Sequence, residues 1–342
     1  MEEKSYAIRR AIAEDAELIV GLFRETYGDK YPHAEMYRPE VLQKRIDKKD
    51  VQALLASAPD GRPVGYFARE KTAPNPNLWE EKGLVVVPDY KQTSVGLELM
   101  NRMQEADFIS GSGVFSFPVC YQYFSQLACV KHGRSDVALC LDLVEGSIFK
   151  ERQAGQGRVA CLLNFSEYTA PSEPMYLPDA YAEMLRELAA PLQKRVFKEA
   201  VGCLPAEGKT VLEAPGLPEA GSWSVAVREV GADWPQCLQE LVAQAQRQQV
   251  ISLRFIINAH RAAAGAAVEE LRQQGFFFGG LAPRWFGSDG IIVQKIFHKE
   301  PDFAGIRLYS QQAKELCSFI RADRKAVQRI HAEKDKRRRK IL

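Results

Sequence analysis

The sequence predicts a mixed α/β protein built from two halves of similar architecture. Three observations support this prediction. The chain has 342 residues, more than twice the length of a typical single domain. Apolar runs of strand length alternate with segments whose apolar residues recur at helical spacing. Each half is expected to close with the same order, helix, strand, helix, strand, strand, which indicates an internal duplication.

In the first half, residue spacing and turn signals predict seven strands and four helices. Leu18, Leu22 and Phe23 recur on one face of a helix. Asp60-Gly61 between two apolar runs is a strong hairpin signal. The predicted strands cover residues 6–9, 51–57, 63–71, 83–87, 114–119, 136–144 and 158–165. The predicted helices cover residues 13–28, 40–46, 93–106 and 121–132.

A linker is predicted between the halves at residues 170–179, because APSEPMYLPD contains three prolines and has no regular period. It divides the chain into domains 1–169 and 170–342. In the second half, helices are expected at residues 180–200, 235–249, 261–274 and 310–330. Strands are expected at residues 210–214, 223–230, 250–257, 276–281 and 290–297. The basic run at 334–340 has no interleaved aromatic residues, which favours a solvated helix end over a site for RNA or membrane.

Composition excludes several classes of protein. The formal net charge of +2 gives no global attraction to nucleic acid or anionic lipid. No apolar run approaches the roughly 20 residues that a membrane-spanning helix needs, and the acidic start MEEKSYAIRR does not resemble a secretory signal. We therefore expect a cytoplasmic protein. The seven Cys and five His are scattered without zinc-ligand spacing, which predicts reduced thiols and no metal site.

The segment LVVVPDYKQTSVGLELM, residues 84–100, carries the most chemical information. A strand ends at a proline, and a short polar loop leads into a helix. The first amides of a helix have no intrahelical acceptors and, with the helix dipole, bind phosphate groups well. Lys91 adds a positive charge, Thr93 and Ser94 add hydroxyls, and Gly96 permits close approach of a ligand to the backbone. Neither GxxxxGK[ST] nor GxGxxG is present, which argues against a P-loop or Rossmann site. A plain strand–loop–helix junction is the alternative reading.

This segment resembles the acyl-CoA-binding motif of the Gcn5-related N-acetyltransferase (GNAT) family, usually Arg/Gln-x-x-Gly-x-Gly/Ala. Lys91 stands at the Arg/Gln position, Ser94 at the first Gly and Gly96 at the second. The element order of residues 6–165 also matches the family. The resemblance implies an acyl-CoA N-acyltransferase fold with two GNAT-like domains. No comparable loop precedes the helix at 235–249, so the second domain is expected to be a degenerate copy.

The resemblance also implies roles for individual residues. The pyrophosphate of CoA would be held by the loop and helix start, that is by Lys91, Gln92, Thr93, Ser94, Val95 and Gly96. Backbone amides of the preceding strand, at Val86 and Val87, would orient the thioester. Glu81 at the start of that strand, with Glu80 adjacent, would be the base, unless it is simply a solvated strand entry. Cys129 stands where the family often has a general-acid Tyr, with Tyr123 as a substitute and burial of the thiol as the structural reading. Tyr27 and Tyr31 would border the acceptor pocket or pack in the core.

The function predicted from this resemblance is that of an acyl-CoA-dependent N-acyltransferase. It would transfer acetyl from acetyl-CoA to a primary amine of a small molecule, peptide or protein. A non-catalytic acyl-CoA sensor or scaffold is the competing prediction, and a protein that uses the fold only to bind a partner is a third. Neither nucleic acid nor membrane is an expected partner. The second half would close the acceptor pocket or mediate formation of a homodimer.

Overall fold

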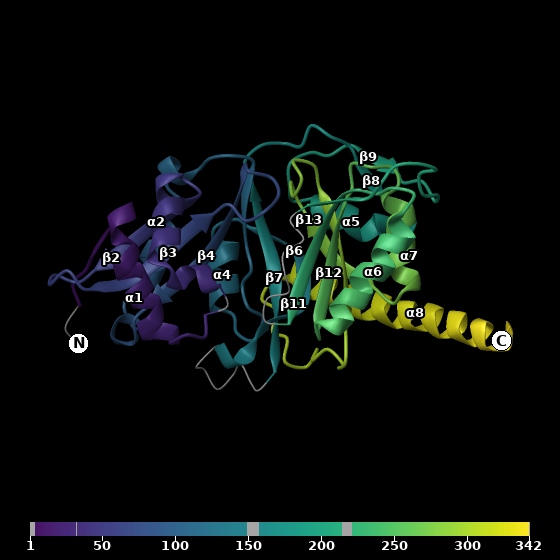
Figure 1. Cartoon of the computed structure of the whole chain (residues 1–342). Coiled ribbons are helices and arrows are strands. Elements are labelled where there is room, and N and C mark those ends of the chain that lie inside the picture. The colour runs from purple at the N-terminus through teal and green to yellow at the C-terminus, as the bar shows by residue number, and fades with distance from the viewer. Residues whose placement is uncertain (1–3, 32, 149–156, 214–220, 342) are drawn as a thin grey trace.

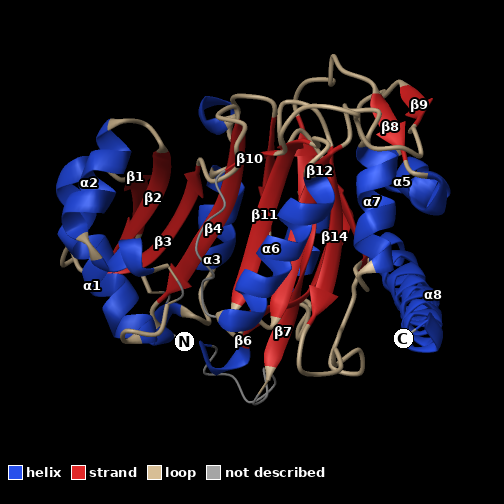
Figure 2. Cartoon of the chain, turned by 45° about the vertical axis from the view of Figure 1, so that its right-hand side comes forward, coloured by secondary structure: helices blue, strands red, loops and turns tan. Residues whose placement is uncertain are grey.

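The computed structural model describes residues 4–31, 33–148, 157–213 and 221–341, the last ten of these as backbone alone. Twelve strands form one continuous mixed sheet, and a separate pair of short strands lies at one edge of the molecule (Figures 1 and 2). Helices cover both faces of the sheet. The mixed α/β fold class predicted from the sequence is therefore confirmed.

The first half supplies seven strands of the large sheet and four α-helices. The strands are β1 (Ala7–Arg10), β2 (Val51–Ser57), β3 (Pro63–Glu70), β4 (Leu78–Val86), β5 (Gly113–Ser116), β6 (Ser135–Glu145) and β7 (Arg158–Glu167). The helices are α1 (Ala16–Tyr27), α2 (Pro39–Asp47), α3 (Val95–Arg102) and α4 (Phe124–Lys131). Every strand and helix expected here from periodicity is present. β2 has the predicted ends, and the other elements differ at one or both ends.

The second half supplies the other five strands of the large sheet. They are β10 (Val211–Glu213), β11 (Ser222–Glu229), β12 (Ser252–Asn258), β13 (Phe277–Ala282) and β14 (Gly290–Ile296). The small sheet consists of β8 (Met175–Leu177) and β9 (Phe197–Glu199). The helices are α5 (Ala182–Ala189), α6 (Trp234–Arg247), α7 (Ala264–Gln273) and α8 (Gln311–Ile341).

Four of the changed boundaries have a clear structural consequence. β4 begins five residues earlier than predicted, because Trp79 and Glu81 are buried and are not part of a solvated strand entry. The helix predicted at 180–200 ends at Ala189, since Pro191 follows and the chain then pairs as β9 with β8, which lies inside the predicted linker. α4 begins at Phe124, so Tyr121 and Tyr123 precede it, although the predicted helix 121–132 included both. α8 continues through the basic run and projects from the body (Figure 1).

The strand order of the second half repeats that of the first. In the first half, β3-β4-β5-β7-β6 lie side by side, with β4 and β5 parallel and the other neighbours antiparallel. In the second half, β10-β11-β12-β14-β13 follow the same order and the same directions. α6 stands where α3 does, and α7 where α4 does. This repeat agrees with the predicted duplication, and the division between residues 169 and 170 remains a prediction.

The halves join edge to edge through β6 and β13. Gly280 lies opposite Ala138, and a Cβ on Gly280 would lie 2.3 Å from the Ala138 Cα, so only glycine permits this approach. The buried Gln294 side chain accepts the Leu141 amide at 2.9 Å and donates to the Leu139 carbonyl at 2.9 Å. One hydrophobic cluster extends from Leu78 in the first half into α8. The second half therefore lies directly beside the sheet region of β5, β6 and β7 and shares a hydrophobic core with it.

Candidate functional site

β4 loses its neighbour β5 halfway along its length. The two strands pair only over residues 78–81 and 113–116. Past this pairing the chain of β5 continues beside β7, where the Leu162 amide donates to the Pro118 carbonyl at 3.0 Å. Residues 82–86 of β4 therefore have β3 on one side and no paired strand on the other within the described residues. We call residues 82–86 the open edge.

Hydrogen bonding to β3 shows which way the amides of Val86 and Val87 point. The Val87 amide donates to the Val64 carbonyl of β3 at 3.0 Å. Val86 pairs with Gly65 in the same register. Because peptide groups in an antiparallel ladder point alternately to the two sides, the Val86 amide faces the open side. Val86 therefore remains a candidate donor to a thioester, whereas the Val87 amide is already used by β3, contrary to what the resemblance implied.

A β-bulge bends the open edge. The register between β3 and β4 changes between Tyr66 and Ala68, so β4 carries one extra residue at Gly83. Gly83 has a φ of 71°, in the left-handed region that glycine adopts without strain. Bulges of this kind increase the local twist of a strand and redirect it. The bulge and the departure of β5 together open the sheet at this point.

The first turn of α3 adjoins the end of the open edge. A Cβ on Gly96 would lie 3.5 Å from the Val86 side chain, so strand end and helix start are in contact. Thr93 accepts the Val95 amide at 3.3 Å and donates to the Tyr90 carbonyl at 2.7 Å, which holds the loop. The next amides of this turn have no intrahelical acceptors and suit an anion. The loop residues predicted for pyrophosphate, including the exposed Lys91 and Gln92, thus lie together.

The predicted motif at residues 91–96 does not include one acidic residue of this helix start, Glu98. Glu98 is hydrogen-bonded to Ser94 and to the Tyr6 hydroxyl. Hydrogen bonds from Ser94 and Tyr6 lower the pKa of the Glu98 carboxyl. Glu98 is therefore a stable negative charge beside the positive end of α3. A carboxylate in the first turn stabilises the free helix but competes with an anionic ligand.

Replacing Glu98 by glutamine is expected to tighten acetyl-CoA binding about two- to fivefold, since an exposed like charge is removed from the anion site. Calorimetric titration at low salt measures the change, which should shrink as salt is added. Glu105→Gln, just after α3, is the control and should bind as the unmodified chain does. Weaker binding by Glu98→Gln would instead show that the carboxylate holds the loop in its binding shape.

Glu81 lies in the core at the last paired position of β4 and β5. Its carboxylate accepts the Arg69 side chain at 2.7 Å and is ion-paired with Arg134. Gln104 donates to the same carboxylate at 3.0 Å. Burial acts to raise the pKa of Glu81, but Arg134 and Arg69 outweigh it and the pKa is lowered. A buried carboxylate held by two arginines is a poor base, so the role predicted for Glu81 is not supported by its surroundings.

Glu80, the adjacent residue, points to the opposite face of the sheet. There it lies across from Glu70 of β3, which pairs with Arg45 at 2.9 Å and with Lys82 at 3.9 Å. Burial raises the pKa of Glu80, against the opposing effects of Lys82 and a hydrogen bond from Thr72. A carboxyl with a raised pKa binds a proton more readily than Glu81 does, which suits a general base.

Tyr27 and Tyr31 lie on the same face of the sheet as Glu80. The Tyr31 ring packs against the Phe23 ring at 4.8 Å and against the Tyr27 ring at 5.1 Å between centroids. The Tyr31 hydroxyl is 3.7 Å from the position of a Cβ on Gly83, so it lies over the bulge. Burial, with Tyr27 and Glu70 nearby, raises the pKa of Tyr31 well above its ordinary value. Tyr31 therefore keeps its proton and can donate a hydrogen bond there.

The two residues predicted as the general acid occupy different surroundings. Cys129 on α4 is buried, 3.7 Å from the Ser116 hydroxyl, and burial raises the pKa of its thiol. Ser116 also accepts from Arg134, which places Cys129 beside the ion pairs of Glu81. Tyr123 is 46% exposed, and its ring packs edge-on against Tyr309 of the second half at 6.4 Å. Neither residue contacts the bulge or Tyr31 in the described hydrogen bonds and ring contacts.

In the second half, the loop before α6 corresponds to the loop predicted for pyrophosphate. Two of its amides are already hydrogen-bonded to other residues of the chain. Residues 208–210 lie against residues 231–233 before α6. The Ala232 amide donates to the Gly208 carbonyl at 3.0 Å, and the Gly231 amide to the Thr210 hydroxyl at 3.2 Å. β11 and β12 also stay paired from Ser222 to Val227, so they do not part as β4 and β5 do. These contacts agree with the predicted degenerate second copy.

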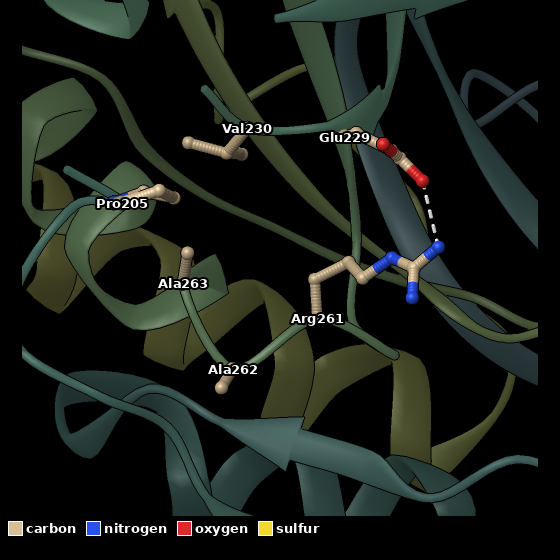
Figure 3. A pocket seen from close by; sticks show the side chains of 6 residues that line it. All are labelled: Pro205, Glu229, Val230, Arg261, Ala262 and Ala263. Atoms are coloured by element: carbon tan, nitrogen blue, oxygen red, sulfur yellow. Dashed lines mark hydrogen bonds and ion pairs between the residues drawn. The ribbon is translucent and has the colours of Figure 1, made fainter. Parts of the chain in front are cut away.

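A cavity of about 390 Å³ lies near the carboxyl ends of β11 and β12. Figure 3 shows the residues that line it, which are Pro205, Glu229, Val230, Arg261, Ala262 and Ala263. Arg261 and Glu229 form an ion pair of 2.7 Å across one side. The charged groups of the cavity therefore satisfy each other.

Among the residues that the structure describes, no group of three or more His, Cys, Asp or Glu side chains could hold a metal ion. In the same residues, no helix combines the length and apolar character needed to span a bilayer.

Comparison with known proteins finds similarity to this chain in structure only. No protein-family model and no curated protein matches the chain. Solved structures of acetyltransferases match about half of it. A putative GNAT acetyltransferase from Desulfovibrio desulfuricans is 17% identical with a TM-score of 0.34, covering 48% of this chain and 99% of that one. The PaiA N-acetyltransferase from Thermoplasma acidophilum, solved with coenzyme A, is 19% identical with a TM-score of 0.30, covering 48% and 99%.

A third match is the ribosomal-protein-S5-alanine acetyltransferase from Vibrio fischeri. It is 12% identical with a TM-score of 0.37 and covers 49% of this chain and 95% of that one. One of these three structures is described as a GNAT acetyltransferase, the family that residues 84–100 resemble.

Proposed function

We propose that the first half of this chain binds an acyl-CoA, with acetyl-CoA as the expected ligand, and transfers the acyl group to a primary amine. The observation that carries the proposal is the open edge of β4 beside the first turn of α3. Backbone donors for a thioester and for a pyrophosphate thereby lie next to each other. The Val86 amide would meet the thioester oxygen, and the amides from Val95 onward the pyrophosphate, with Lys91 and the Thr93 hydroxyl adding to the site.

Chemistry at this site needs a base and a donor on the acceptor side of β4. Glu80 would take a proton from the substrate ammonium, and the freed amine lone pair would attack the thioester carbon. The C–N bond forms and the C–S bond breaks. The new amide nitrogen loses its extra proton to solvent, and solvent protonates the departing CoA thiolate, so the products are the amide and the CoA thiol. Tyr31, which keeps its proton, would donate a hydrogen bond over the bulge. The acceptor is an amine of a small molecule or a peptide.

The proposal is tested by calorimetric titration with acetyl-CoA. The unmodified chain is expected to bind one molecule per chain, and Gly96→Glu to bind at least about tenfold more weakly, because the added carboxylate repels the pyrophosphate. Gly96→Ala is the matched control: its methyl group makes only an ordinary contact with Val86, so binding should persist. Equal binding by the Glu and Ala variants, or no binding by the folded unmodified chain, would refute the proposed site.

An acyl-CoA sensor without turnover is the second candidate function. It is favoured by the burial of Glu81 and Cys129, two of the residues predicted to catalyse, among ion pairs and packed side chains. Release of CoA thiol over a panel of amines separates the two functions. Binding with turnover supports the transferase, and binding without turnover for any amine supports the sensor.

A further inference from the structure

A buried arginine in the second half has no acidic partner among the described residues. Arg254 of β12 is 6% exposed. Its guanidinium donates to three serine hydroxyls: to Ser222 at 3.0 Å, to Ser224 at 2.7 and 3.1 Å, and to Ser252 at 3.1 Å. No described carboxylate forms an ion pair with it. A buried cation that is hydrogen-bonded but not neutralised is costly, since hydroxyls replace only part of its hydration.

The register of the strands explains why these side chains meet. β11 and β12 are parallel, with Ser222 opposite Ser252 and Ser224 opposite Arg254, so all four lie on one face. That face is covered by the hairpin of β6 and β7, because Ser252 donates to the Leu141 carbonyl at 2.9 Å. Ser224 is exposed, so one side of the cluster reaches solvent.

A second cation lies beside the cluster. Arg158 of β7 donates to the carbonyls of Asp142 and Leu143 at 2.7 and 2.8 Å. A Cβ on Gly221, next to Ser222, would lie 3.2 Å from its Nη1 atom. Burial lowers the pKa of Arg158, with a contribution from Arg254, while Glu145 and Asp142 act in the opposite direction.

The other charged groups described near the cluster are Glu145, Asp142 and Lys299. Asp142 is ion-paired with Lys299. For Arg254 itself, burial lowers the pKa, and the neighbours that oppose this are the thiols of Cys140 and Cys161.

The serine hydroxyls are oriented by the arginine. An oxygen that accepts from a guanidinium presents its lone pair to it, so its own proton is directed elsewhere. The hydroxyls of Ser222 and Ser224 can then donate to a group on their outer side. Hydroxyls that point outward beside a guanidinium offer hydrogen-bond donors next to a positive charge, which suits phosphoryl oxygens.

We propose that Arg254, Ser222 and Ser224 form a binding site for a phosphate-type oxyanion, on the face of β11 and β12 beside Arg158. The ligand would supply a negative charge that no described carboxylate provides to Arg254. Free phosphate and the phosphoryl group of a monoester share this chemistry. The site lies in the second half and is independent of the open edge of β4.

The test is a titration with millimolar inorganic phosphate, and separately with methyl phosphate, against chloride at equal ionic strength. Calorimetry and the midpoint of thermal unfolding are both read. We expect saturable binding and a rise in the midpoint for the unmodified chain. Arg254→Met should lose both, and Ser224→Ala should bind about five- to tenfold more weakly because one hydrogen bond to a charged group is removed. Binding of methyl phosphate as well as phosphate would point to a monoester group as the ligand.

The controls separate this site from others. Gly96→Glu should keep the response, which excludes the start of α3 as its source. Arg261→Met removes a surface arginine that is already paired with Glu229 and should also keep it. Without phosphate, Arg254→Met should be at least as stable as the unmodified chain, because it removes an unneutralised buried charge. A response of equal size in all variants, or none in the unmodified chain, would overturn the proposal.

Discussion

Glu81→Gln is expected to lower the free energy of unfolding by about 3–5 kcal/mol, the cost of breaking a buried ion pair on one side only. Arg69 and Arg134 are 0% and 6% exposed, and both lose their carboxylate partner. They are then left as buried charges near the point where β4 and β5 part. Chemical denaturation followed by circular dichroism measures the change.

This effect has a definite pH dependence. The pKa of Glu81 is lowered in the folded protein from its ordinary value of 4.5. The stabilisation is therefore fully present above 4.5 and is lost as pH falls through the lowered folded value. Asp107→Asn, which breaks an ion pair with Arg10 between exposed side chains, is the control and should cost less than about 1 kcal/mol. A loss equally small for Glu81→Gln would mean that the arginines find other partners.

Glu80→Gln is expected to reduce turnover of an amine acceptor at least about 100-fold, the usual contribution of a positioned general base. The amide cannot take up the proton of the substrate ammonium. Acetyl-CoA binding should change little, because Glu80 lies on the opposite face of the sheet from α3. Thiol release measures kcat and KM, and calorimetry measures binding of acetyl-CoA.

The pH profile distinguishes a base from a structural residue. Burial raises the pKa of Glu80 above 4.5, so the acid limb of kcat/KM should lie above that value and disappear in Glu80→Gln. Glu80→Asp keeps a carboxylate and should recover part of the rate, while Glu17→Gln on the exposed side of α1 should act as the unmodified chain. If Glu80→Gln keeps its rate but folded Glu81→Gln loses it, the base assigned from the sequence is restored.

The order of elements and the position of the anion loop could be predicted from local sequence. Helical spacing in α1, the hairpin at Asp60-Gly61 and the strand–loop–helix signal around Pro88 depend on residues close together in the chain. These signals can be recognised without the tertiary structure, because backbone preference and the spacing of apolar side chains depend on residues close together in the chain. The helix predicted at 180–200 ends early in the structure, because a proline and pairing with another strand interrupt the helical spacing.

The assignment of the site residues depended on register and on distant contacts. Whether Glu80 or Glu81 faces the bulge follows from the start of β4 and from its pairing, since neighbouring side chains point to opposite faces. The carboxylate of Glu81 is held by Arg69 and Arg134, which no local pattern links to it. The same holds for Val87, whose amide is used by Val64.

The sequence by itself therefore determined the mixed α/β class, the duplicated order of elements and the strand–loop–helix junction around residues 87–95. Only the tertiary structure decided which neighbouring carboxylate is held by two arginines, which backbone amide is used by β3, and that residues 208–210 hydrogen-bond to the loop before α6. The physical reason is that periodicity is a property of near neighbours, whereas burial, pairing and charge compensation are made by residues brought together by folding.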